Sequence, residues 1–352
     1  MITERLTPLA RFGVNFVAGF VLAVILAPVP VTAQADSPAV SAERPGAGGD
    51  PDIVRVGVGL LDIAKIEEAN QVFHIDAYMV FEWTDPRLAA EATGAPGPGT
   101  RRVPLDAIWN PGLVVVNARG LETRLPWVAT VDGDGNVTVR QRVSGPLAVD
   151  LDLREFPFDT QRLTIDLVSY LHTPSELGFS PDSKLIARPD TFSAEGWSFE
   201  PVDAETSVFR LSDSGPGAPS IRFAIVAERS AAFYILTLAI PLTLVVLLSW
   251  VVHWVPPNLI PARVGMASAT VFSLVALGVT FRLTLPQIDY LTRADRFVIY
   301  STVLVAVSLC VAVATANLTS KERHAEALRL TRITRLVFPF GYLAAIALAA
   351  VA

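Results

Sequence analysis

Cysteine is almost absent from this chain. Its 352 residues include one cysteine, Cys310, so the chain cannot form an internal disulfide. The four histidines (His74, His172, His253 and His324) are scattered singly, an arrangement that is poor for metal binding or catalysis. The sequence also lacks a nucleophile elbow, a glycine-rich phosphate loop and a basic stripe, at a net charge of −6. We therefore expect no enzyme, no cofactor, no metal and no nucleic-acid partner.

Charge is absent from long stretches of the C-terminal third. Hydrophobic residues make up 51% of the chain and the mean hydropathy is +0.45, which is too apolar for a soluble protein of this size. The uncharged runs cover 230–252, 264–281, 297–320 and 336–352, and each is near the length of a membrane-spanning helix. We predict a transmembrane domain over 230–352, with spans at about 231–254, 262–283, 295–318 and 334–352.

A fifth apolar run lies at the N-terminus. It follows Arg5 and Arg11 and ends in the small residues around Ala33. A basic start, an apolar middle and a small-residue end predict a secretory signal peptide over 1–33; the alternative is a retained anchor helix. Residues 34–52, rich in Pro, Gly, Ala and Asp, predict a disordered leader.

The membrane orientation follows from charge. Between the third and fourth runs, residues 321–335 contain five Lys or Arg and only two Glu. Because cytoplasmic loops carry an excess of basic residues, we expect this connection in the cytoplasm. Residues 53–229 then lie outside, which agrees with the predicted signal peptide.

The outer domain has no long helical period. It shows short alternating or apolar runs such as "QVFHIDAYMVFEW" and "SIRFAIVAE", separated by turn signals such as "DGDGN". Seven or more short strands at this spacing predict an antiparallel β-sandwich over 53–229. The fold class is thus an outer β-sandwich followed by a four-helix transmembrane domain.

Several motifs resemble the pentameric ligand-gated ion channels. "FEWTDPRL" (81–88) resembles the family's W-x-D-x-R-L strand, "IWNPGLVVVN" (108–117) its I-W-x-P segment, and "LDLREFPFDTQRL" (151–163) its signature loop. The places of the two loop cysteines fall on Val149 and Leu163, as in bacterial members of the family. The resemblance covers residues 53–352 in order.

The resemblance implies a coupling site between the two domains. It places Glu68, Asp159 and Arg229 in one charge cluster, although Asp159 is also an ordinary turn former after proline. The same site takes in Phe156, Pro157 and Pro286. For Phe156, as for Trp83 and Trp109, the alternative is an ordinary core aromatic.

The ligand site of the family lies between subunits, in a box of aromatics. Tyr78 and Tyr170 match two box positions, His172 lies beside the latter, and Phe209 precedes a hairpin without aromatics (210–220). The place of another box aromatic falls on Val116. Since a cation–π cage needs several rings, we expect no acetylcholine-like ligand. Protons, an acidic metabolite or a small neutral molecule remain open.

The second span lines the pore in this family. Residues spaced by three or four positions share one helix face, and the predicted inward stripe is Gly265, Ala269, Phe272, Ala276, Val279 and Leu283. Five copies of Phe272 would form an apolar constriction that gates by dewetting. The alternative is a lipid-facing phenylalanine.

Selectivity is predicted from the ends of this span. "PARVG" (261–265) resembles the anion-selective glycine and GABA-A receptors, and the chain has no acidic residue between Glu228 and Asp289. Helix N-termini favour anions at the inner mouth. We assign selectivity to Pro261 and Ala262, to Arg282 near the outer mouth, and in lesser part to Arg263.

Together these features predict a homopentameric, ligand-gated, anion-selective channel. Its partners would be four further identical subunits, the lipid bilayer, a permeant anion and an unidentified small molecule or proton. The location would be a bacterial inner membrane, with the N-terminal domain in the periplasm. The alternatives are a cation-selective channel of the same family and a non-conducting membrane-anchored sensor.

Overall fold

The structure is a computed structural model that describes residues 43–90, 99–182, 189, 191–200, 203–212, 215–283 and 285–351. The predicted signal peptide and the first part of the predicted leader lie outside these residues. The last ten residues of the predicted leader, 43–52, are described. Arg44 forms an ion pair with Asp52 at 3.1 Å and donates to the carbonyl oxygen of Glu176 at 3.3 Å. These contacts hold the segment against the first strand.

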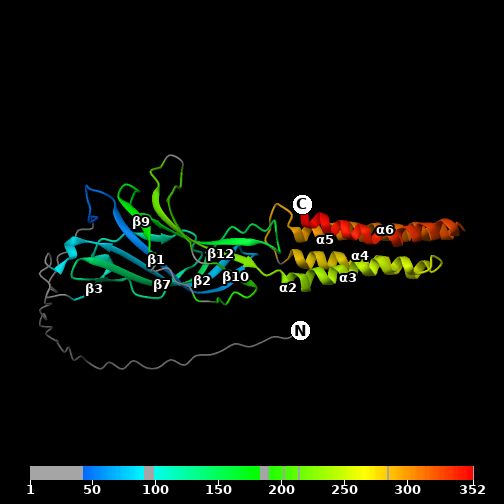
Figure 1. Cartoon of the computed structure of the whole chain (residues 1–352), viewed down its shortest axis with the longest axis horizontal. Helices are drawn as coiled ribbons and strands as arrows, with labels where there is room; N and C mark the ends of the chain where they lie inside the picture. The colour runs from blue at the N-terminus through cyan, green and yellow to red at the C-terminus, as the bar shows by residue number, and fades with distance from the viewer. Residues whose placement is uncertain are drawn as a thin grey trace, which may run out of the picture. The chain divides into compact units, whose positions relative to one another are not determined.

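The outer domain consists of two facing sheets (Figure 1). The first has the order β3 (Arg101–Pro104), β6 (Val128–Val131), β7 (Asn136–Ala148), β2 (Val72–Thr84), β1 (Asp52–Glu67) and β9 (Leu177–Pro181), and β5 (Glu122–Thr123) pairs with β7. The second has the order β10 (Trp197–Phe199), β12 (Ala218–Arg229), β8 (Thr160–Ser169) and β4 (Leu113–Val115), and β11 (Asp203–Phe209) pairs with β12. Two short 3₁₀ turns, η1 (Pro86–Leu88) and η2 (Leu105–Ala107), lie between strands.

The sandwich forms because its strands alternate between buried and exposed residues. On β1, Val54, Val56 and Val58 are fully buried, while Arg55 is exposed and pairs with Glu82 of β2. Side chains from both sheets fill the space between them. The pairing of β9 with β1 is parallel, which departs from the predicted antiparallel pattern.

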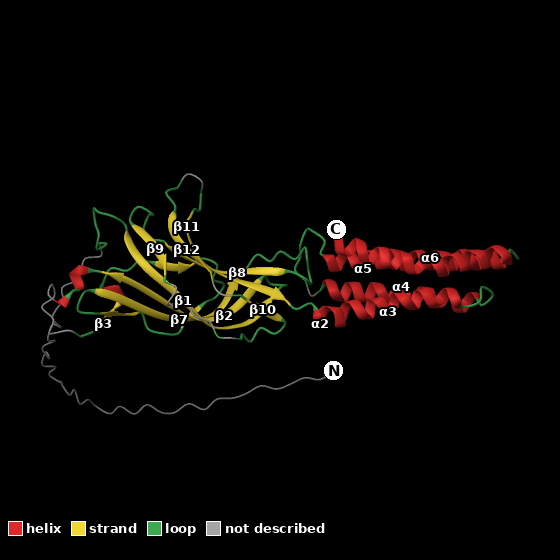
Figure 2. Cartoon of the chain, in the orientation of Figure 1, coloured by secondary structure: helices red, strands yellow, loops and turns green. Residues whose placement is uncertain are grey.

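In the described part of the chain, four helical segments follow the last strand. Figure 2 shows them in red. The first comprises α2 (Ala232–Tyr234), the π-helical η3 (Ile235–Ala239), α3 (Ile240–Val251) and the 3₁₀ turn η4 (Val252–Trp254). The others are α4 (Ile260–Arg282), α5 (Arg293–Ser320) and α6 (His324–Val351). Each is long and apolar enough to cross a membrane. The π turn ends two positions before Pro241, which lacks the N–H that a regular helix needs.

The fourth helix begins ten residues earlier than the predicted span. α6 starts at His324, so only Lys321–Arg323 separate it from α5. Its buried residues Ala327, Thr331 and Phe338 keep helical spacing through the charged part of the sequence. Arg329, Arg332 and Arg335 therefore lie on other faces of a continuing helix, and only Lys321 and Arg323 lie in the connection.

One hydrophobic cluster connects the sandwich to the bundle. It includes Phe156 of the loop between β7 and β8 together with Phe281 and Leu285 at the end of α4. The rings of Phe156 and Phe281 have their centroids 6.0 Å apart. The signature loop thus sits where the two domains meet.

Candidate functional site

Arg229 is the central charged residue of the domain junction. It ends β12, two residues separate it from the first helical segment, and its side chain is 2% exposed. Its Nε donates to Asp159 Oδ1 at 2.7 Å and its Nη2 to Asp159 Oδ2 at 3.2 Å. Its Nη1 donates to Glu68, which follows β1. The structure thus brings together the three charged residues predicted from the sequence.

Aromatic rings surround the guanidinium of Arg229. Its Cζ lies 4.1 Å from the ring centroid of Trp197, 4.8 Å from that of Phe156 and 5.5 Å from that of Tyr234. Neither Trp197 nor Tyr234 was predicted as a junction residue, since neither belongs to a motif. Burial disfavours the charged guanidinium, but its bonds to Asp159 and Glu68 outweigh this and raise the pKa of Arg229.

The buried Asp159 is further fixed by Gln161, whose Nε2 donates to Asp159 Oδ2 at 2.5 Å. The backbone N–H of Arg229 also donates to the carbonyl oxygen of Asp159 at 3.2 Å. The cluster therefore combines the two ion pairs of Arg229 with two neutral hydrogen bonds to Asp159, one from Gln161 and one from the backbone of Arg229. This arrangement links the end of β12 to the signature loop.

The signature loop contacts the membrane domain directly. The backbone N–H groups of Arg293 and Ala294, at the start of α5, donate to the carbonyl oxygens of Arg154 and Phe156 at 3.0 and 3.2 Å. The hydroxyl of Tyr290 accepts from the backbone N–H of Leu153 at 3.0 Å. Pro157 and Pro286 are both buried, in the loop and in the α4–α5 connection respectively. A displacement of this loop would therefore reach both α4 and α5.

A cavity of about 270 Å³ lies beside Arg229. Its lining includes Glu68, Trp197, Arg229 and Tyr234. The junction is therefore not fully packed within one subunit.

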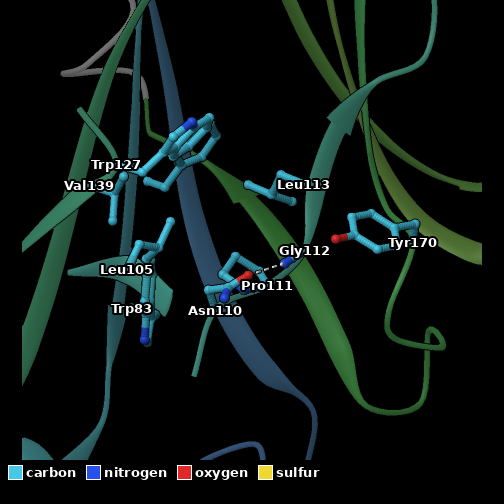
Figure 3. Close-up of a pocket in the computed structure, with 10 residues that line it drawn as sticks. Trp83, Leu105, Asn110, Pro111, Gly112, Leu113, Trp127, Val139 and Tyr170 are labelled. Carbon is cyan, nitrogen blue, oxygen red and sulfur yellow. Dashed lines mark hydrogen bonds between the residues drawn. The ribbon is translucent and has the colours of Figure 1, made fainter. Parts of the chain in front are cut away.

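The predicted ligand residues do not share one pocket. Tyr170 follows β8 and lines a cavity of about 180 Å³ with Trp83, Leu105 and Trp127, and its hydroxyl points toward the segment of Gly112 and Leu113 (Figure 3). The complete lining is Phe81, Trp83, Leu105, Asn110, Pro111, Gly112, Leu113, Trp127, Val139 and Tyr170. The exposed Trp127 is a lining residue that the sequence did not indicate, because it precedes β6 outside any motif.

Tyr78 lies elsewhere, on β2. The guanidinium of Arg142 from β7 lies 5.9 Å from its ring centroid and forms an ion pair with Asp76 at 2.6 Å. The hydrogen bonds from Arg142 lower the pKa of Asp76, against a smaller opposing effect of burial. Phe209 ends β11 and is not among the residues that line the Tyr170 cavity.

His172 packs against the aromatic residues of its own subunit. Its ring centroid lies 5.5 Å from that of Trp109, which makes an edge-on contact with Trp83 at 5.7 Å. The Nε2 atom of His172 is buried and has no hydrogen-bond partner among the described residues. The ring of Trp109 thus contacts both Trp83 and His172 without parallel stacking. His172 is not one of the residues lining the cavity that holds Tyr170.

The predicted stripe on α4 faces away from the rest of its own subunit. The buried residues of the helix are Arg263, Ala267, Thr270, Leu274 and Phe281. Gly265, Ala269, Phe272, Ala276, Val279 and Leu283 are all exposed, Phe272 by 75%. At 100° per residue the two sets lie on roughly opposite sides of the helix. Val271 lies between them and packs partly against the core.

The inner end of α4 is held by Arg263, which is 1% exposed. Its Nη2 bonds to His253 Nδ1 of η4 at 3.3 Å and to Thr331 Oγ1 of α6 at 3.1 Å. The preceding Pro261 and Ala262 are exposed. Even the lesser part in selectivity assigned to Arg263 is not supported, because its guanidinium lies inside the subunit.

At the outer end, Arg282 is not the free cation that the sequence predicted. Its Nε forms an ion pair with Asp295 Oδ1 at 3.1 Å. Asp295 is buried because it belongs to the capping box of α5, where its carboxylate accepts from the N–H of Thr292 at 3.0 Å. Asp295 lies thirteen positions after Arg282, and no sequence pattern identified it as the partner of Arg282.

A β-sandwich joined through a charged cluster to four membrane-spanning helices defines a membrane receptor with an outer binding domain. The profile of the neurotransmitter-gated ion-channel ligand binding domain matches residues 40–229, and that of the neurotransmitter-gated ion-channel transmembrane region matches residues 238–338. The chain therefore belongs to the neurotransmitter-gated ion-channel family, a family of channels and not of enzymes.

Individual relatives are more distant. The gamma-aminobutyric acid receptor subunit rho-3 of Homo sapiens is 26% identical over 301 residues, which are 84% of this chain and 64% of that subunit. The same subunit of Rattus norvegicus is 26% identical over 297 residues, which are 83% of this chain and 64% of that subunit. A proton-gated ion channel of Gloeobacter violaceus is 22% identical over 301 residues, which are 86% of this chain and 83% of that channel. The matched region thus spans less than two thirds of the receptor subunits.

Proposed function

We propose that this protein is a ligand-gated ion channel of five identical subunits. A small molecule or a proton acts on the outer domain, and α4 of each subunit lines the pore. The location would be a bacterial inner membrane, with the sandwich in the periplasm after removal of the signal peptide.

The observation that carries this proposal is the two-sided character of α4. A span in a simple bundle exposes its apolar side chains to lipid, but the outward stripe of α4 includes Gly265, Ala269 and Ala276. Small residues spaced in this way leave room around a common axis, and Phe272 gives the narrowest ring. Such a ring of apolar side chains closes a pore by dewetting.

Anion selectivity is supported by the lack of acid near this helix. No Asp or Glu occurs between Glu228 and Asp289, so α4 has no carboxylate to attract cations. Its N-terminal N–H groups have no side-chain cap, and Pro261 occupies the first turn. Five converging helix N-termini would present partial positive charge to an anion.

Cation selectivity is the second candidate, and one contact favours it. The ion pair between Arg282 and Asp295 removes much of the positive charge that the sequence placed at the outer mouth. Asp289, in the connection between α4 and α5, is exposed. With the outer end nearly neutral, the inner end alone must select for anions.

The ligand site would lie between subunits. Tyr78 lies on β2 of one sheet, and Tyr170 directly follows β8 of the other. Tyr78 is not among the residues that line the cavity of Tyr170. The ion-paired Arg142 beside Tyr78 suits a ligand with a carboxylate, whereas the apolar lining around Trp127 suits a neutral one. A non-conducting sensor would have the same outer domain, but it would not need the small-residue stripe.

Reversal potentials test the proposal. Purified protein in planar bilayers under a chloride gradient should give currents that reverse near the chloride potential. Insertion of Glu between Pro261 and Ala262 should shift the reversal toward sodium. Wild-type reversal at the sodium potential would establish the cation channel, and the absence of current with every class of agonist would support the sensor.

A further inference from the structure

We propose that His253 is a positioning residue for the inner end of α4, and that it acts only as the neutral tautomer with its proton on Nε2. His253 lies in η4, at the end of the first span, and is fully buried. The inference bears on the pore through the proposed function, because α4 is the helix that would line it. The tests do not require a conducting protein.

The need for a positioning residue comes from the charge of Arg263. Arginine stays protonated in proteins, and this side chain is buried, with no hydrogen-bond partner for Nε or Nη1 among the described residues. The sequence has no Asp or Glu over 229–288, 296–321 or 327–352, so the membrane spans contain no carboxylate that could neutralise it. A buried charge without a counter-ion is costly. The few neutral acceptors that Arg263 contacts must therefore hold its guanidinium.

His253 supplies one of two side-chain acceptors for Arg263. The Nη2 group of Arg263 bonds to His253 Nδ1 at 3.3 Å and to Thr331 Oγ1 at 3.1 Å. A guanidinium can only donate, so Nδ1 must offer its lone pair and cannot carry a proton. The proton of the neutral ring then lies on Nε2. A charged ring would turn an N–H toward the guanidinium and place two positive charges side by side.

The other ring nitrogen selects the same tautomer independently. His253 Nε2 lies 2.9 Å from Ser308 Oγ of α5, and this hydroxyl donates its proton to the carbonyl oxygen of Ser249 in α3 at 3.2 Å. A hydroxyl whose proton is used in this way has only lone pairs left for the imidazole, so Nε2 must donate. All donors thus point in one direction, from Arg263 through His253 and Ser308 to the backbone of α3. This chain ties the first turn of α4 to α3 and α5.

The surroundings of the ring contain no acid that would favour its charged form. Arg335 of α6 donates from Nε to the carbonyl oxygen of His253 at 2.8 Å, which brings a second cation close to the same residue. On α6 the ring of Phe338 lies 6.2 Å from the imidazole between centroids. The neutral ring is therefore the form that fits between two arginines.

The first test measures the tautomer by solid-state NMR of the full chain in lipid nanodiscs with isotope-labelled histidine. His253 should show a protonated Nε2 and an unprotonated Nδ1 at neutral pH, and its signals are those missing from H253N. A proton on Nδ1, or on both nitrogens, would overturn the proposal. Because no current is recorded, this failure is distinct from a failure of the proposed channel function.

The second test compares two amides in place of the imidazole, by hydrogen exchange of the backbone amides of residues 263–267. H253N keeps an acceptor near the position of Nδ1, whereas H253Q places its amide near that of Nε2 and keeps only the contact with Ser308. Exchange should rise about tenfold in H253Q, because a bond from a charged donor is lost, and less than about threefold in H253N.

The matched control is His324→Asn, the same change at the exposed histidine that begins α6. It should leave exchange in α4 unchanged. Equal exchange in H253N and H253Q would overturn the proposal, because the acceptor at Nδ1 would then not hold α4. A rise in His324→Asn equal to that in H253Q would overturn it as well, since the effect would not be specific to His253.

Discussion

Removal of Arg229 should expose how strongly the junction depends on its buried ion pair. In Arg229→Ala, Asp159 keeps its hydrogen bond from Gln161 but loses its positive partner, while its side chain is only 1% exposed. Breaking a buried pair by removal of one partner costs about 3–5 kcal/mol. Because Gln161 remains, we expect a loss of about 3 kcal/mol in the free energy of unfolding.

The double variant R229A/D159N should recover much of this loss, since no buried charge remains. The coupling free energy between the two positions should be about 2 kcal/mol. The same cycle with Glu68→Gln should give about 1 kcal/mol or less, because the side chain of Glu68 is 19% exposed and solvent screens the pair.

Chemical denaturation of the full chain, followed by tryptophan fluorescence, measures these free energies. Trp197 lies against the guanidinium and serves as a local reporter. Glu67→Gln is the control, because Glu67 is adjacent in sequence but pairs with Lys65. If the losses from Arg229→Ala and Asp159→Asn simply add, or if Glu67→Gln equals Glu68→Gln, the three residues do not act as one cluster.

Three further outcomes are expected. Phe272→Ser should raise the current without agonist more than Phe272→Ala does, because the Ser hydroxyl also forms hydrogen bonds with water. Val271→Ser should raise this current least. Equal currents from the two Ser variants would mean that the inward face of α4 is wrongly assigned. The lowered pKa of Asp76 adds stability that is present above its ordinary value of 3.8 and is lost as the pH falls through the lower folded value. Unfolding midpoints of Asp76→Asn between pH 5 and 2 should therefore fall less with acid than those of the wild type, and parallel curves would exclude this role of Arg142. Tyr170→Ala should raise the agonist concentration for half activation at least tenfold, as read from dose–response currents, and an unchanged value would place the ligand elsewhere.

The fold was predictable because its signals are local. Alternating residues such as Val54, Val56 and Val58 predict a strand whatever the rest of the chain does. Uncharged runs likewise predict membrane spans. The start of α6 was not predictable in this way, because a helix continues through charged residues when one face, here Ala327 and Thr331, stays buried.

The site was only partly predictable, because ion pairs depend on partners that are far apart in the sequence. The motifs placed Asp159 and Arg229 together, but no pattern linked Arg282 to Asp295 or Arg263 to His253. Both links arise from helix packing. An arginine beside an apolar run has the same appearance in the sequence whether it faces water, a pore or the interior of its own subunit.

The two arginines of α4 have a mechanical consequence. One is tied to η4 and α6 at the inner end, the other to α5 at the outer end, so the helix resembles a beam clamped at both supports. The helix cannot rotate about its axis as a rigid body without breaking the contacts of both arginines, but it can bend between them. Phe272 lies about midway, roughly 14 Å from each arginine along the axis at 1.5 Å per residue. Bowing displaces the midpoint most, so in the proposed pentamer the pore radius would change most at Phe272.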